Sequence, residues 1–172
     1  MVSTTKENHH KTAPLSAMIK PWWSWWCVII AGFSLFSGCS GTMPSLGIHD
    51  KKLSECPAAP HCVNSQSVEG DHFVEPLMLT GSSIEVREKI LTVLDTLAPI
   101  TVTLVEEGYI RAEARSRLFR FVDDLEFYFP DTADQPVTVH VRSASRVGYT
   151  DLGVNRQRVE NLRQLLQSPG SH

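Results

Sequence analysis

One polar stretch lies between two apolar elements and organises the rest of the chain. It reads Arg142-Ser143-Ala144-Ser145-Arg146-Val147-Gly148-Tyr149-Thr150-Asp151-Leu152-Gly153-Val154-Asn155-Arg156-Gln157-Arg158. Four arginines, two serines, two glycines, an aspartate and an asparagine fall within these seventeen residues. The stretch follows the alternating run 137–141 and leads into an amphipathic run that ends near Gln167. Because polar groups between packed elements must find partners, we expect either a binding site or an internal polar network here.

Outward from this stretch, period-two alternation of apolar and polar residues predicts the strands. The segments are 73–79, 100–105, 109–115, 118–122, 125–129 and 137–142. Segment 73–79 should be an edge strand, because Pro76 cannot donate to a central ladder. Segments 118–122 and 125–129 are expected to be joined or kinked at Asp123-Asp124. In segment 137–142 the three valines should face the core, with Thr138, His140 and Arg142 facing outward.

Two runs have the spacing of amphipathic helices. The first begins at a capping box of Ser82 and Glu85 and stops at Pro99. Its expected apolar stripe comprises Ile84, Ile90, Leu91, Leu94 and Leu97. The second begins near Asp151 as N-cap and carries Val159, Leu162, Leu165 and Leu166. The order of elements predicts an α+β fold, an antiparallel sheet of about five strands with two helices packed on one face.

The first 39 residues resemble a bacterial lipoprotein signal. Lysines precede the apolar run 22–36, whose fifteen residues are fewer than the roughly 20 that span a bilayer. Phe36-Ser37-Gly38-Cys39 resembles a lipobox, which implies a lipid on Cys39 after cleavage. The alternative is an uncleaved signal anchor. The lipoprotein interpretation predicts the cell envelope, with the domain facing the periplasm and Ser40 favouring the outer membrane.

The remaining chain divides into a flexible tether (40–55), one globular domain (56–167) and a short tail (168–172). From Ser40 onward it carries 13 Lys+Arg and 18 Asp+Glu, so its formal charge is 13 − 18 = −5. Nucleic-acid binding requires a basic face to neutralise phosphates. We therefore expect no nucleic-acid partner.

Cys56 and Cys62 are the cysteine pair left once the signal is removed and Cys39 carries lipid. In an exported chain a disulfide is the ordinary state of such a pair. A metal site is one alternative, with candidate ligands His49, Cys56, His61, Cys62 and His72. These residues match no standard zinc spacing. A catalytic dithiol usually has two residues between its cysteines, and this pair has five. We expect a structural disulfide, with no metal or other cofactor.

Three motifs together are similar to one known family. They are Cys56-Pro57-x-x-Pro60-x-Cys62-Val63-x-Ser65, Phe121-x-Asp123-Asp124-x-Glu126-Phe127 and the block from Arg142 to Val159. They resemble the domain of unknown function 1499 family over about residues 53–166. That family occurs in bacteria and plant plastids, and many bacterial members look like lipoproteins. His61 departs from the pattern, where the family usually has asparagine. The resemblance implies relatives and brings no agreed activity.

The chemistry of the polar block supports two interpretations. Arginine forks, close-approaching glycines and the helix N-terminus near Asp151 suit a phosphate, sulfate or carboxylate. Alternatively, Arg142 or Arg146 pairs with Asp123 or Asp124, and Asp151 only caps the helix. The candidate residues for an anion site or polar network are Arg142, Ser143, Ser145, Arg146, Tyr149, Asp151, Asn155, Arg156, Asp123 and Asp124.

The leading functional prediction is a non-enzymatic, membrane-anchored envelope domain that binds an anionic ligand or a partner protein. The alternative is an envelope hydrolase that uses Ser143 or Ser145 with His140 and Asp123. No nucleophile-elbow motif supports this triad. Asp123 and Asp124 as an acid–base pair would face opposite ways along one strand. Arginines engaged with carboxylates would favour a structural module, whereas an open pocket containing Arg142, Ser145 and His140 would favour chemistry.

Overall fold

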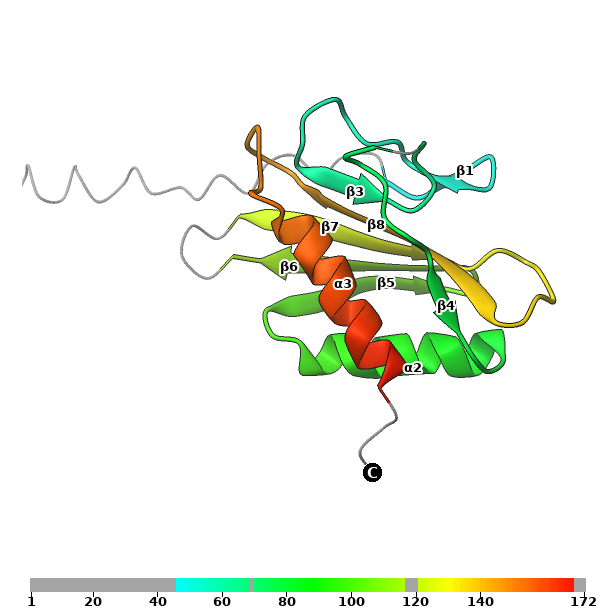
Figure 1. Cartoon of the computed structure of the whole chain (residues 1–172). Coiled ribbons are helices and arrows are strands. Elements are labelled where there is room, and N and C mark those ends of the chain that lie inside the picture. The colour runs from blue at the N-terminus through cyan, green and yellow to red at the C-terminus, as the bar shows by residue number, and fades with distance from the viewer. Residues whose placement is uncertain (1–45, 69, 117–120, 169–172) are drawn as a thin grey trace, which may run out of the picture. The chain divides into compact units, whose positions relative to one another are not determined.

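The computed structural model describes residues 46–68, 70–116 and 121–168 (Figure 1). The predicted signal peptide, Cys39 and residues 40–45 of the predicted tether lie outside these residues, as do residues 169–172 of the tail. Within the described residues, none of the helices has the length and apolar character needed to cross a membrane.

The centre of the fold is an antiparallel sheet, as predicted. Its strand order is β3 (Cys62–Asn64), β8 (Val137–Ser145), β7 (Val122–Tyr128), β6 (Tyr109–Arg115) and β5 (Ile100–Glu106). A short strand, β4 (Leu77–Leu79), pairs with the first residues of β8, while β3 pairs with its last part. The predicted strand 73–79 is thus shortened to three residues beyond Pro76. The long strand β8 is therefore held by three neighbours.

Helix α2 (Ser83–Thr96) begins at the predicted capping box. The Glu85 main-chain N–H donates to Ser82 Oγ, and the Ser82 N–H donates back to the Glu85 carboxylate. The buried residues are Val86, Ile90 and Leu94. The placement of Ile84 in the apolar stripe was wrong: it lies in the first turn and is 66% exposed, and Val86 takes its place in the core.

Helix α3 (Val154–Gln167) begins three residues after Asp151, with Gly153 as N-cap at φ 81°. Its buried residues are Asn155, Val159, Leu162 and Leu166, whereas Leu165 is exposed, contrary to the predicted stripe. Both helices contribute to the apolar core on the same face of the sheet, as predicted (Figure 1). We call this face the helix side of the sheet.

Strand β7 corrects a second prediction. Residues 122–128 form one continuous strand that includes Asp123 and Asp124, without the expected break. Segment 118–120 lies outside the described residues. Both aspartates are in the ladder, where Asp123 lies opposite Ser145 and Asp124 opposite Ala144. An unbroken strand sends the two carboxylates to opposite faces of the sheet.

The segment before the disulfide covers the other face, which we call the loop side. Residues 48–53 form a hairpin of β1 (Ile48–His49) and β2 (Lys52–Leu53). Leu53 is buried against Tyr109 and Tyr128 of the sheet. The predicted tether therefore does not describe residues 48–53, which belong to the domain. Three scattered apolar residues (Leu46, Ile48, Leu53) with no period were too weak a signal for this hairpin.

Candidate functional site

The polar block is divided between the two faces of the sheet, because successive side chains of a strand point in opposite directions. On β8, Ser143 and Ser145 hydrogen-bond to groups of α3 on the helix side. Arg142 and the following Arg146 interact with carboxylates on the loop side. The candidate residues thus form two separate clusters with different partners.

The helix-side cluster consists of Asp123, Ser143, Ser145, Asn155 and Arg158. Arg158 Nη2 donates to Asp123 Oδ2 at 2.5 Å, and Ser145 Oγ donates to the other Asp123 oxygen at 2.6 Å. Asn155 is fully buried, and its Oδ1 accepts from Ser143 Oγ and Arg158 Nη1. Its amide nitrogen approaches the Ser145 hydroxyl and donates to the His61 carbonyl oxygen, both at 3.1 Å. Each polar side chain of this cluster has a protein partner.

Asp151 serves the N-terminus of α3. Its carboxylate accepts the main-chain N–H groups of Gly153 at 3.0 Å and Asn155 at 2.8 Å. Burial opposes ionisation of this carboxyl, but the N–H donors outweigh burial and lower its pKa. The N–H groups that a bound anion would use at a helix start are therefore already served by the protein's own carboxylate.

The loop-side cluster consists of Glu113, Asp124, Glu126, Arg142 and Arg146. Arg146 forms a bidentate pair with Asp124, with Nε–Oδ2 at 2.8 Å and Nη2–Oδ1 at 2.6 Å. The same Nη2 donates to Glu113 Oε1 at 2.6 Å. The hydrogen bond to Asp124, together with the bond to Glu113, raises the pKa of Arg146 against the effect of burial. The bond from Arg146 in turn lowers the pKa of Glu113.

Glu126 is the innermost carboxylate of this cluster and is 0% exposed. It accepts from Arg142 Nη1 at 2.9 Å, from the Tyr109 hydroxyl at 2.7 Å and from the Gly47 N–H at 3.0 Å. Burial and the adjacent Glu126 charge raise the pKa of Tyr109, so its hydroxyl stays a proton donor. Arg142 was expected to face outward, and either Arg142 or Arg146 was expected to pair with Asp123 or Asp124. Arg146 forms such a pair with Asp124, but Arg142 does not. Instead it is buried with Glu126, because the N-terminal segment covers the loop side of the sheet.

The predicted disulfide joins Cys56 and Cys62, with an S–S distance of 2.08 Å and a Cα–Cα distance of 5.6 Å. Cys62 lies in β3, opposite Ala144 of β8. The His61 carbonyl oxygen accepts from the Ser145 N–H at 3.0 Å and from the Asn155 side chain. The disulfide loop is therefore docked where β8 ends. The metal alternative loses both of its thiolates to this bond.

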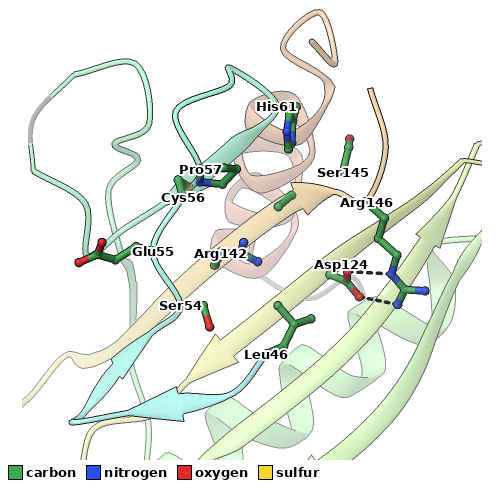
Figure 2. A pocket seen from close by; sticks show the side chains of 11 residues that line it. Leu46, Ser54, Glu55, Cys56, Pro57, His61, Asp124, Arg142, Ser145 and Arg146 are labelled. Atoms are coloured by element: carbon green, nitrogen blue, oxygen red, sulfur yellow. Dashed lines mark hydrogen bonds and ion pairs between the residues drawn. The ribbon is translucent and has the colours of Figure 1, made fainter. Parts of the chain in front are cut away.

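A pocket of about 410 Å³ lies between the disulfide loop and the loop side of β7 and β8 (Figure 2). We call it the Arg142 pocket. It is lined by Leu46, Ser54, Glu55, Cys56, Pro57, His61, Asp124, Arg142, Ala144, Ser145 and Arg146. Two buried nitrogens of lining residues, Arg142 Nε and His61 Nδ1, have no hydrogen-bond partner within the part of the chain that the structure describes. These two nitrogens distinguish the pocket from the fully bonded helix-side cluster.

In the hydrolase alternative Ser145 does meet Asp123, but His140 lies apart from both serines. The side chain of His140 points to the loop side of the sheet, whereas Ser143 and Ser145 hydrogen-bond within the helix-side cluster. His140 Nδ1 lies 3.2 Å from Ser65 Oγ, and its ring stacks on Tyr128 at a centroid distance of 6.0 Å. Ser65 Oγ also accepts the Val141 N–H at 2.9 Å, so this hydroxyl already holds β8.

Two predicted site residues have other surroundings. Arg156 donates to the carbonyl oxygens of Phe73 and Asp71, at 2.8 and 2.7 Å, and so fastens α3 to the chain before β4. Tyr149 is 76% exposed on the loop before α3. Sequence reasoning missed Glu113, Glu126 and Tyr109 as site residues. It named His61 only as a candidate metal ligand, and it left Arg158 of the polar block out of the candidate site. The sequence did contain a signal for Glu126. It lies two residues after Asp124 on one strand, so both side chains point to the same face of the sheet.

The fold and the site define a small, disulfide-bonded α+β domain with paired arginine–carboxylate clusters on both faces of one sheet. The family described as protein of unknown function (DUF1499) matches residues 52–166, and the chain belongs to this family. No curated protein matches the chain. The family match covers most of the described domain and names no activity.

Proposed function

We propose that this protein is a lipid-anchored envelope domain that binds, without catalysis, a small ligand with a carboxyl or carbonyl group. One observation carries the ligand proposal: Arg142 Nε and His61 Nδ1 are buried, lack a partner among residues 46–68, 70–116 and 121–168, and belong to residues that line the same pocket. A buried donor without a partner costs about 1–3 kcal/mol. A ligand oxygen placed between the disulfide loop and β8 would remove that cost.

The charges around the pocket restrict the class of ligand. Arg142 and Arg146 are already neutralised by Glu126, Asp124 and Glu113. Exposed Glu55 adds a further negative group among the lining residues. A phosphate or sulfate, with up to two negative charges, would therefore be repelled more strongly by these carboxylates than a ligand with one charge or none. One carboxyl or carbonyl oxygen on an apolar body suits the Arg142 Nε–H donor, and also His61 in the tautomer that carries its proton on Nδ1. Leu46, Pro57, Ala144 and the disulfide give the pocket apolar walls.

The arginine contacts also favour binding over catalysis. Arg142, Arg146 and Arg158 each form an ion pair of 2.9 Å or less with a carboxylate of β7. A general base within reach of a serine nucleophile is what a hydrolase of the predicted type would need. The described geometry supplies Ser143 and Ser145 with an amide or a carboxylate instead.

The test of the pocket is thermal unfolding with two probes, hexanoate and inorganic phosphate. Hexanoate should raise the melting temperature in a concentration-dependent way, and phosphate should raise it less. His61→Phe keeps a flat ring and removes Nδ1, so it should abolish the hexanoate shift. His49→Phe, outside the pocket, is the control. Equal stabilisation by both probes, or an unchanged response in His61→Phe, contradicts the proposal.

Arg142→Lys gives an independent test of the same pocket. Lysine keeps a positive charge for Glu126 but lacks the Nε–H group and the planar fork. The variant should fold and lose the hexanoate response. Retention of that response would show that Arg142 Nε takes no part in binding.

The anchor rests on the short apolar run 22–36 and the lipobox-like 36–39. Mass spectrometry of the membrane-extracted protein should find a lipid on an N-terminal Cys39. Cys39→Ala should leave an unprocessed precursor. An aqueous wild-type protein without lipid on Cys39 would reject the anchor and leave the pocket proposal standing.

A further inference from the structure

The loop between β8 and α3 presents large apolar side chains to solvent. Tyr149 is 76% exposed, Leu152 is 91% exposed and Val154 is 50% exposed. Single exposed apolar residues are common on soluble proteins, but a group of them within one loop indicates an interaction surface. We call residues 147–154 the apolar loop.

The polar clusters hold this loop in place. Arg146, immediately before the loop, is fastened to Asp124 and Glu113. Asn155, immediately after it, is buried in the helix-side cluster. Leu152 has a left-handed backbone at φ 55°, which is unfavourable for a residue with a Cβ. Its N–H donates to Thr150 Oγ1 at 3.2 Å. The protein thus maintains a strained conformation in which Leu152 lies almost wholly in solvent.

The loop has almost no free charge. Asp151 is the single charged residue in 147–154, and its carboxylate accepts N–H groups of Gly153 and Asn155. A partner recognised through salt bridges would find no cation there. Apolar side chains with a tyrosine are instead the composition found where proteins meet the boundary between lipid and water.

The length of chain between Cys39 and the domain indicates the occupant. Six residues, 40–45, separate Cys39 from Leu46. Even fully extended, this stretch covers no more than about 25 Å. Leu46 is the first residue that the structure describes, and it lines the same pocket as Arg146. The described chain therefore begins beside the start of the apolar loop. A membrane that holds a lipid on Cys39 is therefore kept within reach of the loop.

We propose that the apolar loop inserts Tyr149 and Leu152 into the surface of the membrane that holds the Cys39 lipid. This inference rests on the proposed lipid anchor. The insertion would provide a second attachment point beside the acyl chains, and two linked attachments bind more strongly than either alone. It would also orient the domain, with the end of β8 next to the membrane.

The experiment uses Leu152→Trp in the membrane-extracted protein, reconstituted in phosphatidylcholine vesicles with brominated acyl chains. Fluorescence is read as the difference from the parent protein, so Trp22, Trp23, Trp25 and Trp26 do not contribute if the signal is retained. The new tryptophan should be quenched and its emission blue-shifted. Val68→Trp is the matched control, because Val68 is 90% exposed on another loop. It should remain unquenched. Tyr149→Trp repeats the test with a second side chain.

The mass of the same sample reports separately on the anchor. A lipid on Cys39 with no quenching at positions 149 and 152 overturns loop insertion and leaves the anchor intact. Quenching of equal strength at Val68 also overturns it, because contact would then not be specific to the loop. If Cys39 carries no lipid, the anchor is rejected. In that case the protein is mixed with vesicles directly: quenching of the introduced tryptophan still supports loop insertion, and the absence of quenching overturns it. Protection of the introduced tryptophan by a co-purifying protein, without lipid quenching, overturns insertion and assigns the loop to a protein partner instead.

The side chains themselves can be tested without a fluorophore. Tyr149→Ser with Leu152→Ser should weaken vesicle binding of the chain from Ser40 onward, which lacks both the apolar run 22–36 and Cys39, at least about tenfold. Each buried apolar side chain contributes about a factor of ten. Raising the salt concentration should change the binding little, because the loop lacks a free charge. Equal binding of the double variant and the parent, or loss of binding in salt, contradicts hydrophobic insertion.

Discussion

On the helix side of the β7–β8 pair, Asp123 meets Arg158, whereas on the loop side the next residue, Asp124, meets Arg146. Both clusters join a carboxylate of β7 to an arginine, and both lie at the same end of the sheet. The helix-side cluster is packed under α3, and its side chains are satisfied by protein groups. The loop-side cluster borders a pocket, where Arg142 Nε and His61 Nδ1 of the adjacent disulfide loop have no partner among the described residues.

The difference shows that ion pairing alone does not distinguish a structural network from a binding site. Both clusters contain an arginine paired with a carboxylate of β7. Unmet hydrogen-bonding capacity next to accessible space separates them, since buried polar groups are otherwise almost always paired. The helix-side cluster therefore has a structural role, since it joins α3 to β7 and β8. The loop-side cluster supports the proposal of a bound ligand.

The largest expected effect concerns the loop-side cluster. Arg142→Ala leaves the fully buried Glu126 carboxylate without its cation and should lower the free energy of unfolding by about 3–5 kcal/mol. Urea denaturation measures the loss. Arg142→Met combined with Glu126→Gln should recover most of it, because glutamine can still accept from Tyr109 and Gly47. A double variant as unstable as the single one would show that the ion pair is not the main contribution.

The second prediction tests whether the helix-side cluster is purely structural. Arg158→Ala removes the partner of Asp123 and should cost about 2–3 kcal/mol of unfolding free energy. Gln157→Ala, on the exposed side of the same helix, should change the free energy by less than about 0.5 kcal/mol. The hexanoate response should persist in folded Arg158→Ala. Loss of the hexanoate response in this variant would show that ligand binding depends on both clusters.

The disulfide connects stability to the pocket. Replacing Cys56 and Cys62 by serine should lower the unfolding free energy by about 2 kcal/mol, from the added freedom of the unfolded loop. The hexanoate response should also weaken, because Cys56 lines the pocket. Parallel urea curves with and without a thiol reductant measure the first effect. Under reduction, the unfolding free energy of the parent protein should fall to that of the double variant. The unfolding free energy of the variant should not change with the reductant.

The smallest expected effect is a pH dependence from His140. Burial lowers the pKa of His140 below its ordinary 6.5, so the folded state binds fewer protons than the unfolded state. Its contribution to stability is thus present above pH 6.5 and is lost as the pH falls. Urea midpoints between about pH 7.5 and pH 5.5 should decrease in the parent and change less in His140→Gln. This range lies above the titration of Glu113, because the pKa of that carboxyl is lowered from 4.5. An unchanged slope in His140→Gln, with His49→Gln as control, would contradict the assignment.

Local patterns predicted much of the fold. Alternating residues specified most of the strands, and the capping box of Ser82 and Glu85 located the start of α2. These features depend on contacts within a few residues, which a sequence displays directly. The cysteine pair was equally readable, because Cys56 and Cys62 are the two cysteines of the predicted globular domain and have one way to join.

The sequence by itself therefore determined the α+β class, the disulfide and the polar block as the unusual region of the chain. Only the tertiary structure decided which side of the sheet each polar residue serves. Glu126 is sixteen residues from Arg142 and Gly47 is seventy-nine from Glu126, so no local pattern joins them. The hairpin 48–53 and the docked disulfide loop cover the loop side, and this cover turns an expected outward Arg142 into a buried one. Burial depends on what lies above a residue, which is a property of the folded chain.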